Sequence, residues 1–147
     1  MFKKILVPVD GSETAWRALE QAAALAGKFD GGLVILTVIQ PYDNVALMAV
    51  PIDPGIIRQS NADLEEIGKS VLSAAKDKVK ESGFTGKTEY EMELGHPSER
   101  ILAVAKSSQA DAIVIGSRGL SGIAEFFLGS VSAKISQYSN IPVLIVK

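Results

Sequence analysis

The sequence predicts an α/β fold: a single domain built on an open, parallel, five-stranded sheet with helices on both faces. Short apolar runs, such as residues 32–39, alternate with longer segments whose apolar residues recur at helical spacing. This alternation favours a parallel sheet, because each strand returns to the sheet through a helix. The chain has 147 residues, of which 47% are hydrophobic, which suits one domain with one buried core.

The first half of the chain is predicted to run strand, helix, strand, helix. Residues 3–9 (KKILVPV) and 32–39 (GLVILTVI) are continuous apolar runs, typical of strands buried on both faces. Residues 15–28 form a helix with one apolar face made of Trp16, Leu19, Ala22, Ala23 and Ala26. Residues 60–83 repeat this spacing with Leu64, Ile67, Val71 and Val79, and Gly83 is a natural helix end.

The second half continues the pattern. Residues 87–94 alternate in polarity, so this third strand should lie half exposed toward a sheet edge. Residues 97–108 form a short helix, and residues 111–116 are a fully apolar strand. A helix at 130–139 and a strand at 141–147 complete the sheet.

The segment 40–57 does not fit this alternation. It is punctuated by Pro41, Pro51 and Pro54, yet it carries the apolar stretch VALMAV. Loops of this length in a compact domain are lids, partner surfaces or disordered.

Composition narrows the function classes. Fifteen basic and seventeen acidic residues give a net charge of −2, so no nucleic-acid partner is expected. The chain has no cysteine, which excludes disulfides and thiolate chemistry. The apolar run at the N-terminus is too short for a signal peptide or a membrane span, so we expect a cytoplasmic protein without a membrane partner.

Residues that could bind a ligand follow the ends of two predicted strands. The first strand runs into DGSET, which places Asp10 in a turn and Ser12 where it can cap the next helix. The fourth runs into Gly116 and a glycine-rich loop. Ligands of such sheets bind outside the carboxyl ends of the strands. If these two strands are neighbours, a carboxylate faces a glycine loop across one crevice.

The glycine loop GSRGLSGIAEFFLGS, residues 116–130, matches neither the Walker A spacing nor the dinucleotide fingerprint. Gly116 and Gly119 would allow positive φ and close approach of backbone amides to an anion. Ser130 is placed to cap the following helix, whose N-terminus also attracts anions. The alternative is that the glycines only form turns and Ser130 only caps a helix; the pattern by itself leaves both open.

Four stretches together resemble the universal stress protein family over essentially the whole chain: KILVPVDGSETAWRAL, GHPSERIL, ADAIVIGSRGLSGIAEFFLGSVSAKI and IPVLIVK. The specific element is G-x-x-G-x9-G-[ST], matched by Gly116, Gly119, Gly129 and Ser130. This is the pattern of the ATP-binding branch of the family. The resemblance implies a Rossmann-like sheet of strand order 3-2-1-4-5, with the first and fourth strands side by side. Pro8 must then lie in a central strand, and we place it at the end of that strand.

The resemblance also implies the ligand residues. Asp10 would contact the ribose, residues at the end of the second strand would border adenine, and the glycine loop would surround the phosphates of ATP, with Mg²⁺ held mainly by those phosphates. The implied nucleotide-binding residues are Pro8, Val9, Asp10, Thr37, Val38, Ile39, Ile115, Gly116, Ser117, Arg118, Gly119, Gly129, Ser130, Val131 and Ser132.

Three function classes follow: a nucleotide-dependent regulatory module with an unknown protein partner, a slow ATPase or self-phosphorylating enzyme, and a dimeric scaffold with a vestigial site. The first is preferred, because no Ser/His/Asp constellation and no metal-ligand cluster is visible, and we expect at most weak ATP hydrolysis. His96 is interpreted as a loop residue near a helix start. The last strand is an apolar edge, and the resemblance implies a homodimer through it.

Overall fold

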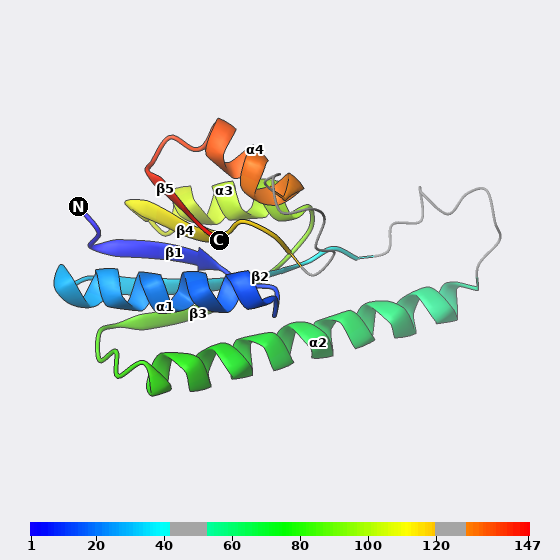
Figure 1. Cartoon of the computed structure of the whole chain (residues 1–147). Helices are drawn as coiled ribbons and strands as arrows, with labels where there is room; N and C mark the ends of the chain where they lie inside the picture. Colours follow the sequence, from blue (N-terminus) through cyan, green and yellow to red (C-terminus); the bar gives the residue numbers. More distant parts are fainter. Residues whose placement is uncertain (42–52, 120–128) are drawn as a thin grey trace.

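The computed structural model describes residues 1–41, 53–119 and 129–147. These residues form one parallel sheet of order β3-β2-β1-β4-β5, with α1 and α2 on one face and α3 and α4 on the other (Figure 1). The predicted fold class and strand order are confirmed. The strands are β1 (Lys4–Pro8), β2 (Gly32–Ile39), β3 (Thr88–Leu94), β4 (Ala112–Gly116) and β5 (Val143–Val146). The helices are α1 (Glu13–Lys28), α2 (Pro54–Glu81), α3 (Pro97–Ser107) and α4 (Ser130–Tyr138).

The start of α2 is the main departure from the predicted boundaries. The helix begins at Pro54 rather than at residue 60, inside the segment predicted as a loop. Asp53 caps it by accepting a hydrogen bond from the Gly55 amide at 2.6 Å, and proline is favourable in the first turn because its missing N–H has no partner there anyway. Residues 42–52 of the segment 40–57, for which a lid, a partner surface and disorder were the alternatives, lie outside the described residues.

The reversal of strand order falls between β1 and β4. Ile5 lies opposite Ala112 and Leu6 opposite Ile113, so these two strands are neighbours. Pro8 is the last residue of β1, and the next amide, that of Val9, donates to the Leu36 carbonyl at 2.8 Å. The proline therefore lies at the end of a central strand, where the missing donor costs least.

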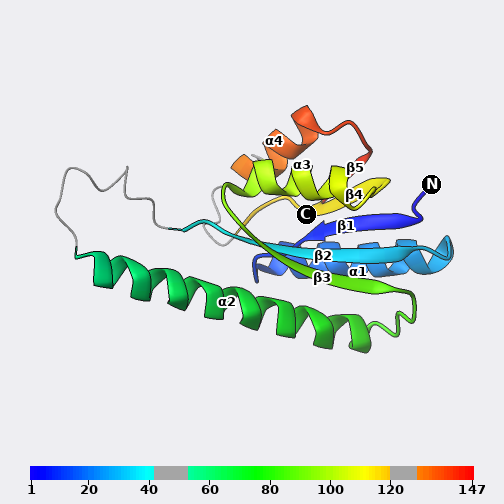
Figure 2. The ribbon, with the colours of Figure 1, turned by 180° about the vertical axis from the view of Figure 1, so that it is seen from behind.

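Each face of the sheet packs against its own layer of helices. The α1 and α2 layer covers a cluster that includes Ile5, Val7, Leu19 and Ile35. The α3 and α4 layer covers a second cluster that includes Leu6, Ile101, Ile113 and Ile135. Seen from behind, β3 forms one edge of the sheet, with half-buried residues as predicted (Figure 2).

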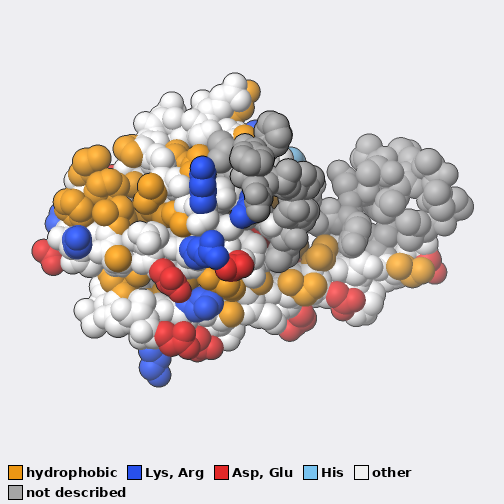
Figure 3. Space-filling model, viewed as in Figure 1, with side chains coloured by type: hydrophobic (Ala, Val, Ile, Leu, Met, Phe, Trp, Pro, Cys, Tyr) orange, Lys and Arg blue, Asp and Glu red, His pale blue; other side chains and the backbone are white. Residues whose placement is uncertain are grey.

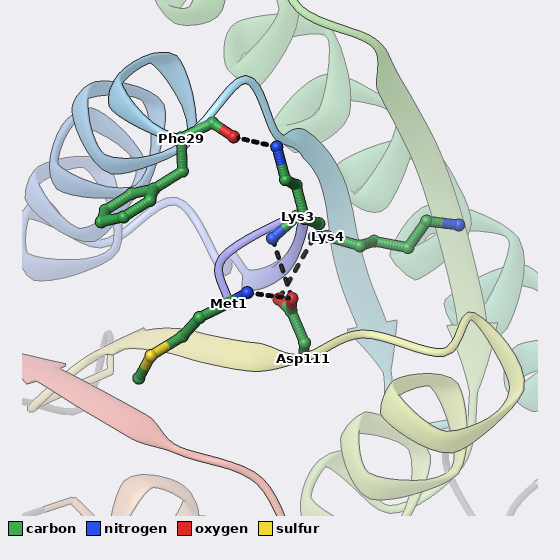
Figure 4. A network of polar contacts seen from close by, with 5 residues as sticks. All are labelled: Met1, Lys3, Lys4, Phe29 and Asp111. Atoms are coloured by element: carbon green, nitrogen blue, oxygen red, sulfur yellow. Dashed lines mark hydrogen bonds and ion pairs between the residues drawn. The ribbon is translucent and has the colours of Figure 1, made fainter.

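At the other end of the strands, Asp111 ties the start of β4 to the start of β1. Its carboxylate accepts hydrogen bonds from the backbone amides of Lys3 at 2.8 Å and Lys4 at 3.2 Å, and the amino group of Met1 lies 4.0 Å away (Figure 4). The Lys3 side chain turns to the Phe29 carbonyl at 2.6 Å. These contacts fix the register of β1 and β4 at their amino ends, and the crevice lies at the carboxyl ends of the same two strands.

Within the described ranges, no helix has both the length and the apolar composition needed to cross a bilayer.

Candidate functional site

A cavity of about 340 Å³ opens at the carboxyl ends of β1 and β4, where strand order reverses and ligands of open α/β sheets bind. Its volume falls in the range of small-molecule sites. The lining comes from β1, α1, β2, α3, β4 and α4, and from the turns that follow the strands. It comprises Pro8, Val9, Asp10, Ala15, Val38, Pro97, Ile101, Ile115, Gly116, Arg118, Gly119, Gly129, Ser130, Val131 and Ser132.

The structure brings most of the predicted residues to this cavity and leaves out Thr37, Ile39 and Ser117. Thr37 and Ile39 are buried, and Ile39 packs against α2 at Gly68. Successive residues of a strand point to opposite faces, so only Val38 of this trio lines the cavity. Ser117 is also buried, with 5% of its surface exposed.

Sequence reasoning did not identify three lining residues, Ala15, Pro97 and Ile101. Pro97 and Ile101 are one helical turn apart on α3, so their shared face could be read from the sequence. The sequence does not show which turn of this helix reaches the crevice. His96 lies just before this helix, is exposed, and has its Nδ1 3.0 Å from Ser98 Oγ.

Asp10 and Gly119 face one another across the crevice. One carboxylate oxygen of Asp10, Oδ1, accepts the Ser12 amide at 2.9 Å and closes the turn. The other, Oδ2, would lie 2.9 Å from a Cβ built on Gly119. The expected juxtaposition of one carboxylate and one glycine loop is therefore present.

The turn after β4 is fixed by hydrogen bonds on both sides. The Ser117 amide donates to the Val146 carbonyl at 2.7 Å, which extends the ladder between β4 and β5. The Ser117 carbonyl accepts from the Gly129 amide at 2.7 Å and from the Ser132 hydroxyl at 3.1 Å. The Ser132 hydroxyl therefore donates to backbone carbonyls of the turn, although the residue also lines the cavity.

The described glycines of this loop, Gly116, Gly119 and Gly129, serve close packing and do not adopt positive φ. Of the described glycines, those with positive φ are Gly11, Gly83 and Gly95, so the predicted left-handed geometry at Gly116 and Gly119 is absent. A Cβ on Gly116 would instead lie 2.7 Å from the Thr14 backbone. A side chain there would clash with the first turn of α1.

The N-terminus of α4 opens into the same cavity. Ser130 is the first residue of the helix and Gly129 precedes it as the cap, without a side-chain capping bond. Ser130 was expected to be the cap itself; its exposed side chain is instead free of that role. The free amides and the dipole at such a helix end favour an anion.

The charge of the site comes from one acid and one base, Asp10 and Arg118, among the lining residues. Val38, Pro97, Ile101, Ile115 and Val131 supply an apolar wall. In the part of the chain that the structure describes, no three His, Asp or Glu side chains come together to hold a metal. A divalent cation would need most of its oxygen ligands from a bound phosphate and from water.

A larger hollow of about 740 Å³ lies at the opposite end of the strands, lined by residues such as Lys28, Asp30, Gly86 and Glu89. Lys87 pairs with Glu89 at 2.8 Å. Helix carboxyl ends border this hollow, and their negative dipole disfavours anions. Size therefore does not select the site; the position at the strand carboxyl ends does.

The universal stress protein family model matches residues 1–147, the whole chain. This chain belongs to the universal stress protein family. It is 38% identical to universal stress protein YxiE of Bacillus subtilis, with all of both chains covered. It is 32% identical to universal stress protein MJ0531 of Methanocaldococcus jannaschii, over 100% of this chain and 83% of the relative.

Solved structures show the same fold in the family. Hypothetical protein MJ0577, a universal stress protein of Methanocaldococcus jannaschii, superposes with a TM-score of 0.83 at 31% identity, covering 100% of this chain and 96% of its own. A universal stress protein solved in complex with cAMP superposes with a TM-score of 0.74 at 27% identity, covering 99% and 97%.

Proposed function

We propose that this universal stress protein is a nucleotide-dependent regulatory module that binds ATP in the crevice between β1 and β4. The observation that carries the proposal is the meeting of Asp10, the turn Gly116–Gly119 and the N-terminus of α4 on one cavity. A carboxylate accepts hydrogen bonds from ribose hydroxyls, and the amides of a turn and a helix N-terminus donate to phosphate. The apolar wall formed with Val38 and Ile101 suits a purine base.

The relative solved in complex with cAMP supports an adenine nucleotide as the ligand class. ATP is preferred over cAMP here because two separate groups of amides, one in the turn and one at α4, flank the cavity. A polyphosphate can reach both, whereas a single cyclic phosphate can engage one. Mg²⁺ would enter with ATP, held mainly by the phosphates.

Isothermal titration calorimetry of the purified protein with ATP, AMP, cAMP and adenosine tests this proposal. We expect ATP to bind most tightly and adenosine most weakly, since each engaged phosphate adds charge-assisted hydrogen bonds. Tighter binding of cAMP than of ATP would overturn the choice of ATP. No binding of any of the four would overturn the proposed function.

A regulatory role is preferred over phosphoryl transfer for a structural reason. The hydroxyl of Ser132 donates to carbonyl oxygens, and among the described residues no His, Asp or Glu side chain is hydrogen-bonded to Ser117, Ser130 or Ser132. A serine nucleophile needs such a base. ATP turnover and phosphosite mapping on the same preparation would reveal the enzymatic alternative.

We also propose that the protein forms a homodimer through β5. This strand is a sheet edge, and Leu144 is 45% exposed. Figure 3 shows hydrophobic side chains gathered at one end of the molecule, where Figure 1 draws β5 and the N-terminus. Antiparallel pairing of two β5 strands across a twofold axis would cover this edge and close at two subunits.

A further inference from the structure

Three buried hydroxyls, those of Ser12, Thr14 and Ser132, hold the phosphate-facing turn from behind. Ser12, the residue before α1, is 7% exposed, and its Oγ donates to the Arg118 carbonyl at 3.4 Å, a long hydrogen bond. Thr14, on the first turn of α1, is 7% exposed, and its Oγ1 donates to the Arg118 carbonyl at 2.5 Å. Ser132, on α4, is 2% exposed and donates to the carbonyls of Ser117 at 3.1 Å and Gly129 at 3.0 Å. The carbonyl oxygens of the turn are therefore directed into the protein, toward the two helices.

Planarity of the peptide then fixes where the amides point. In a trans peptide the N–H of one residue points opposite to the carbonyl of the residue before it, and the described backbone has no cis peptide. Because the Arg118 carbonyl is held toward Thr14, the Gly119 amide points away from α1. Gly119 lines the cavity, and its amide donates to no described acceptor.

Other amides of the loop are already used. Those of Ser117 and Gly129 donate to protein carbonyls at 2.7 Å each. The amides of Arg118, Gly119 and Ser130 have no acceptor among the described residues. Among the described residues of the loop, the amides left for an anion are those that follow a hydrogen-bonded carbonyl. Ser132 donates to the carbonyls before Arg118 and Ser130, and Thr14, with Ser12, donates to the carbonyl before Gly119.

Close packing lets Thr14 reach the turn. A Cβ on Gly116 would lie 2.7 Å from Thr14 Oγ1 and 2.9 Å from the Ala15 nitrogen, so α1 rests directly on the end of β4. Ser12 caps α1 by accepting the Ala15 amide at 3.3 Å, which fixes the first turn of the helix. The Thr14 hydroxyl therefore has a defined place before any ligand binds.

We infer that Thr14 is a positioning residue for phosphate recognition: by holding the Arg118 carbonyl, it aims the Gly119 amide at a phosphate group of the nucleotide. This inference rests on the proposed function. Thr14 does not itself touch the ligand. Without the Thr14 hydroxyl, the Arg118 carbonyl keeps only the longer hydrogen bond from Ser12 at 3.4 Å. The peptide between Arg118 and Gly119 is then freer to rotate, and more of the ordering of the amide falls on the binding step. The loss should fall on the phosphates and spare the nucleoside.

The test compares three variants by calorimetry with ATP and with adenosine. Thr14→Val removes the hydroxyl and keeps the shape, Thr14→Ser retains a hydroxyl, and Thr88→Val is the matched control. The Thr88 hydroxyl also donates to a carbonyl, that of Gly86 at 3.4 Å, but it lies at the opposite end of the sheet. We expect Thr14→Val to weaken ATP binding about tenfold, the value of one lost hydrogen bond, and adenosine binding less than about twofold. Thr14→Ser should restore ATP binding, and Thr88→Val should leave it unchanged.

A second measurement needs no variant. In nitrogen-15 spectra of the wild-type protein, the Gly119 amide should shift on addition of ATP and shift far less with adenosine. An unmoved Gly119 amide in an ATP-bound protein overturns the inference. A folded Thr14→Val protein with wild-type ATP affinity also overturns the inference. Equal losses of affinity for ATP and adenosine overturn it as well, because they would indicate a general loosening of α1. A wild-type protein that binds no ATP would overturn the proposed function as well, so the two failures are distinguishable.

Discussion

Asp10 and Gly119 come from opposite sides of the crevice, and Asp10 Oδ2 lies within 2.9 Å of the place where a Gly119 side chain would begin. If the turn binds phosphate as proposed, a carboxylate so close to it must meet a hydrogen-bond donor of the ligand rather than a phosphate. Ribose hydroxyls are such donors. We therefore expect that removing the charge of Asp10 weakens nucleotide binding.

Asp10→Asn should weaken ATP and adenosine binding by a similar factor, about tenfold or more, because a hydrogen bond to a charged acceptor contributes about 1.5–3 kcal/mol. Asparagine keeps an oxygen for the Ser12 amide, so the turn survives. Calorimetry with both ligands measures the effect. Tighter ATP binding by the variant would mean that Asp10 repels the phosphates and does not hold the ribose.

Gly129→Val should reduce ATP affinity at least tenfold without unfolding the protein. An added Cβ would lie 3.1 Å from the Ser117 carbonyl and 3.5 Å from the Arg118 Cα, so the larger side chain displaces the turn itself. Overpacking of this kind costs about 1–3 kcal/mol. Gly27→Ala is the control, since its Cβ would meet only Phe84 at 3.9 Å. ATP affinity unchanged in a folded Gly129→Val protein would contradict the assigned place of the phosphates.

Gly68→Ala should destabilise the protein, although Ala is the better helix former. Gly68 lies inside α2, where a Cβ would approach Ile39 Cδ1 to 2.5 Å and Met92 Sδ to 2.9 Å. Ile39 Cδ1 and Met92 Sδ belong to the ends of flexible side chains that can shift in part, so we expect an overpacking cost of at most about 2 kcal/mol. Against a gain in helix propensity of about 1 kcal/mol, this leaves a net loss of at most about 1 kcal/mol. Urea unfolding measures it.

The double variant Gly68→Ala, Ile39→Val removes the closest atom and should recover part of that stability. If Gly68→Ala by itself stabilised the protein by the full propensity gain, the contact of α2 with Ile39 would be looser than it is here.

Asp111→Ala should lower the free energy of unfolding by about 1–2 kcal/mol, because two backbone amides lose a charged acceptor at a partly exposed site. Asp77→Ala, an exposed position of α2, is the control. Urea unfolding of both variants checks the prediction. An Asp111 variant as stable as the control would show that water replaces the carboxylate at no cost.

Leu144→Lys or Ile145→Lys should yield monomers in sedimentation velocity at low micromolar concentration, because either lysine places a charge at the proposed β5 interface. Ile67→Lys is the control: this residue is 58% exposed on α2, away from the β5 edge. If both β5 variants sedimented as the wild-type dimer does, the interface would lie elsewhere.

The sequence by itself determined the strands, the helices and the polar and glycine residues at the strand ends, whereas the strand order that brings two of these ends together was implied by the family resemblance. Apolar strands alternating with amphipathic helices leave few topologies. Gly116 ends one strand, and Asp10 and Gly119 follow shortly after strand ends, which lie at one edge of the sheet. These features are local, so periodicity and turn chemistry report them. The signal for the start of α2 was also local, because Asp53 and Pro54 are a typical cap and first residue of a helix. The prolines of the segment nevertheless indicated a loop.

Tertiary structure decided which atoms face the ligand. Whether Val38 or Ile39 lines the cavity depends on the sheet face that α2 covers, and Ala15 and Ile101 reach it only through the packing of their helices. The Arg118 carbonyl, which precedes the Gly119 amide, accepts a hydrogen bond from the Thr14 hydroxyl across a separation of 104 residues. Such contacts arise when the layers pack together, and no pattern along the chain encodes them.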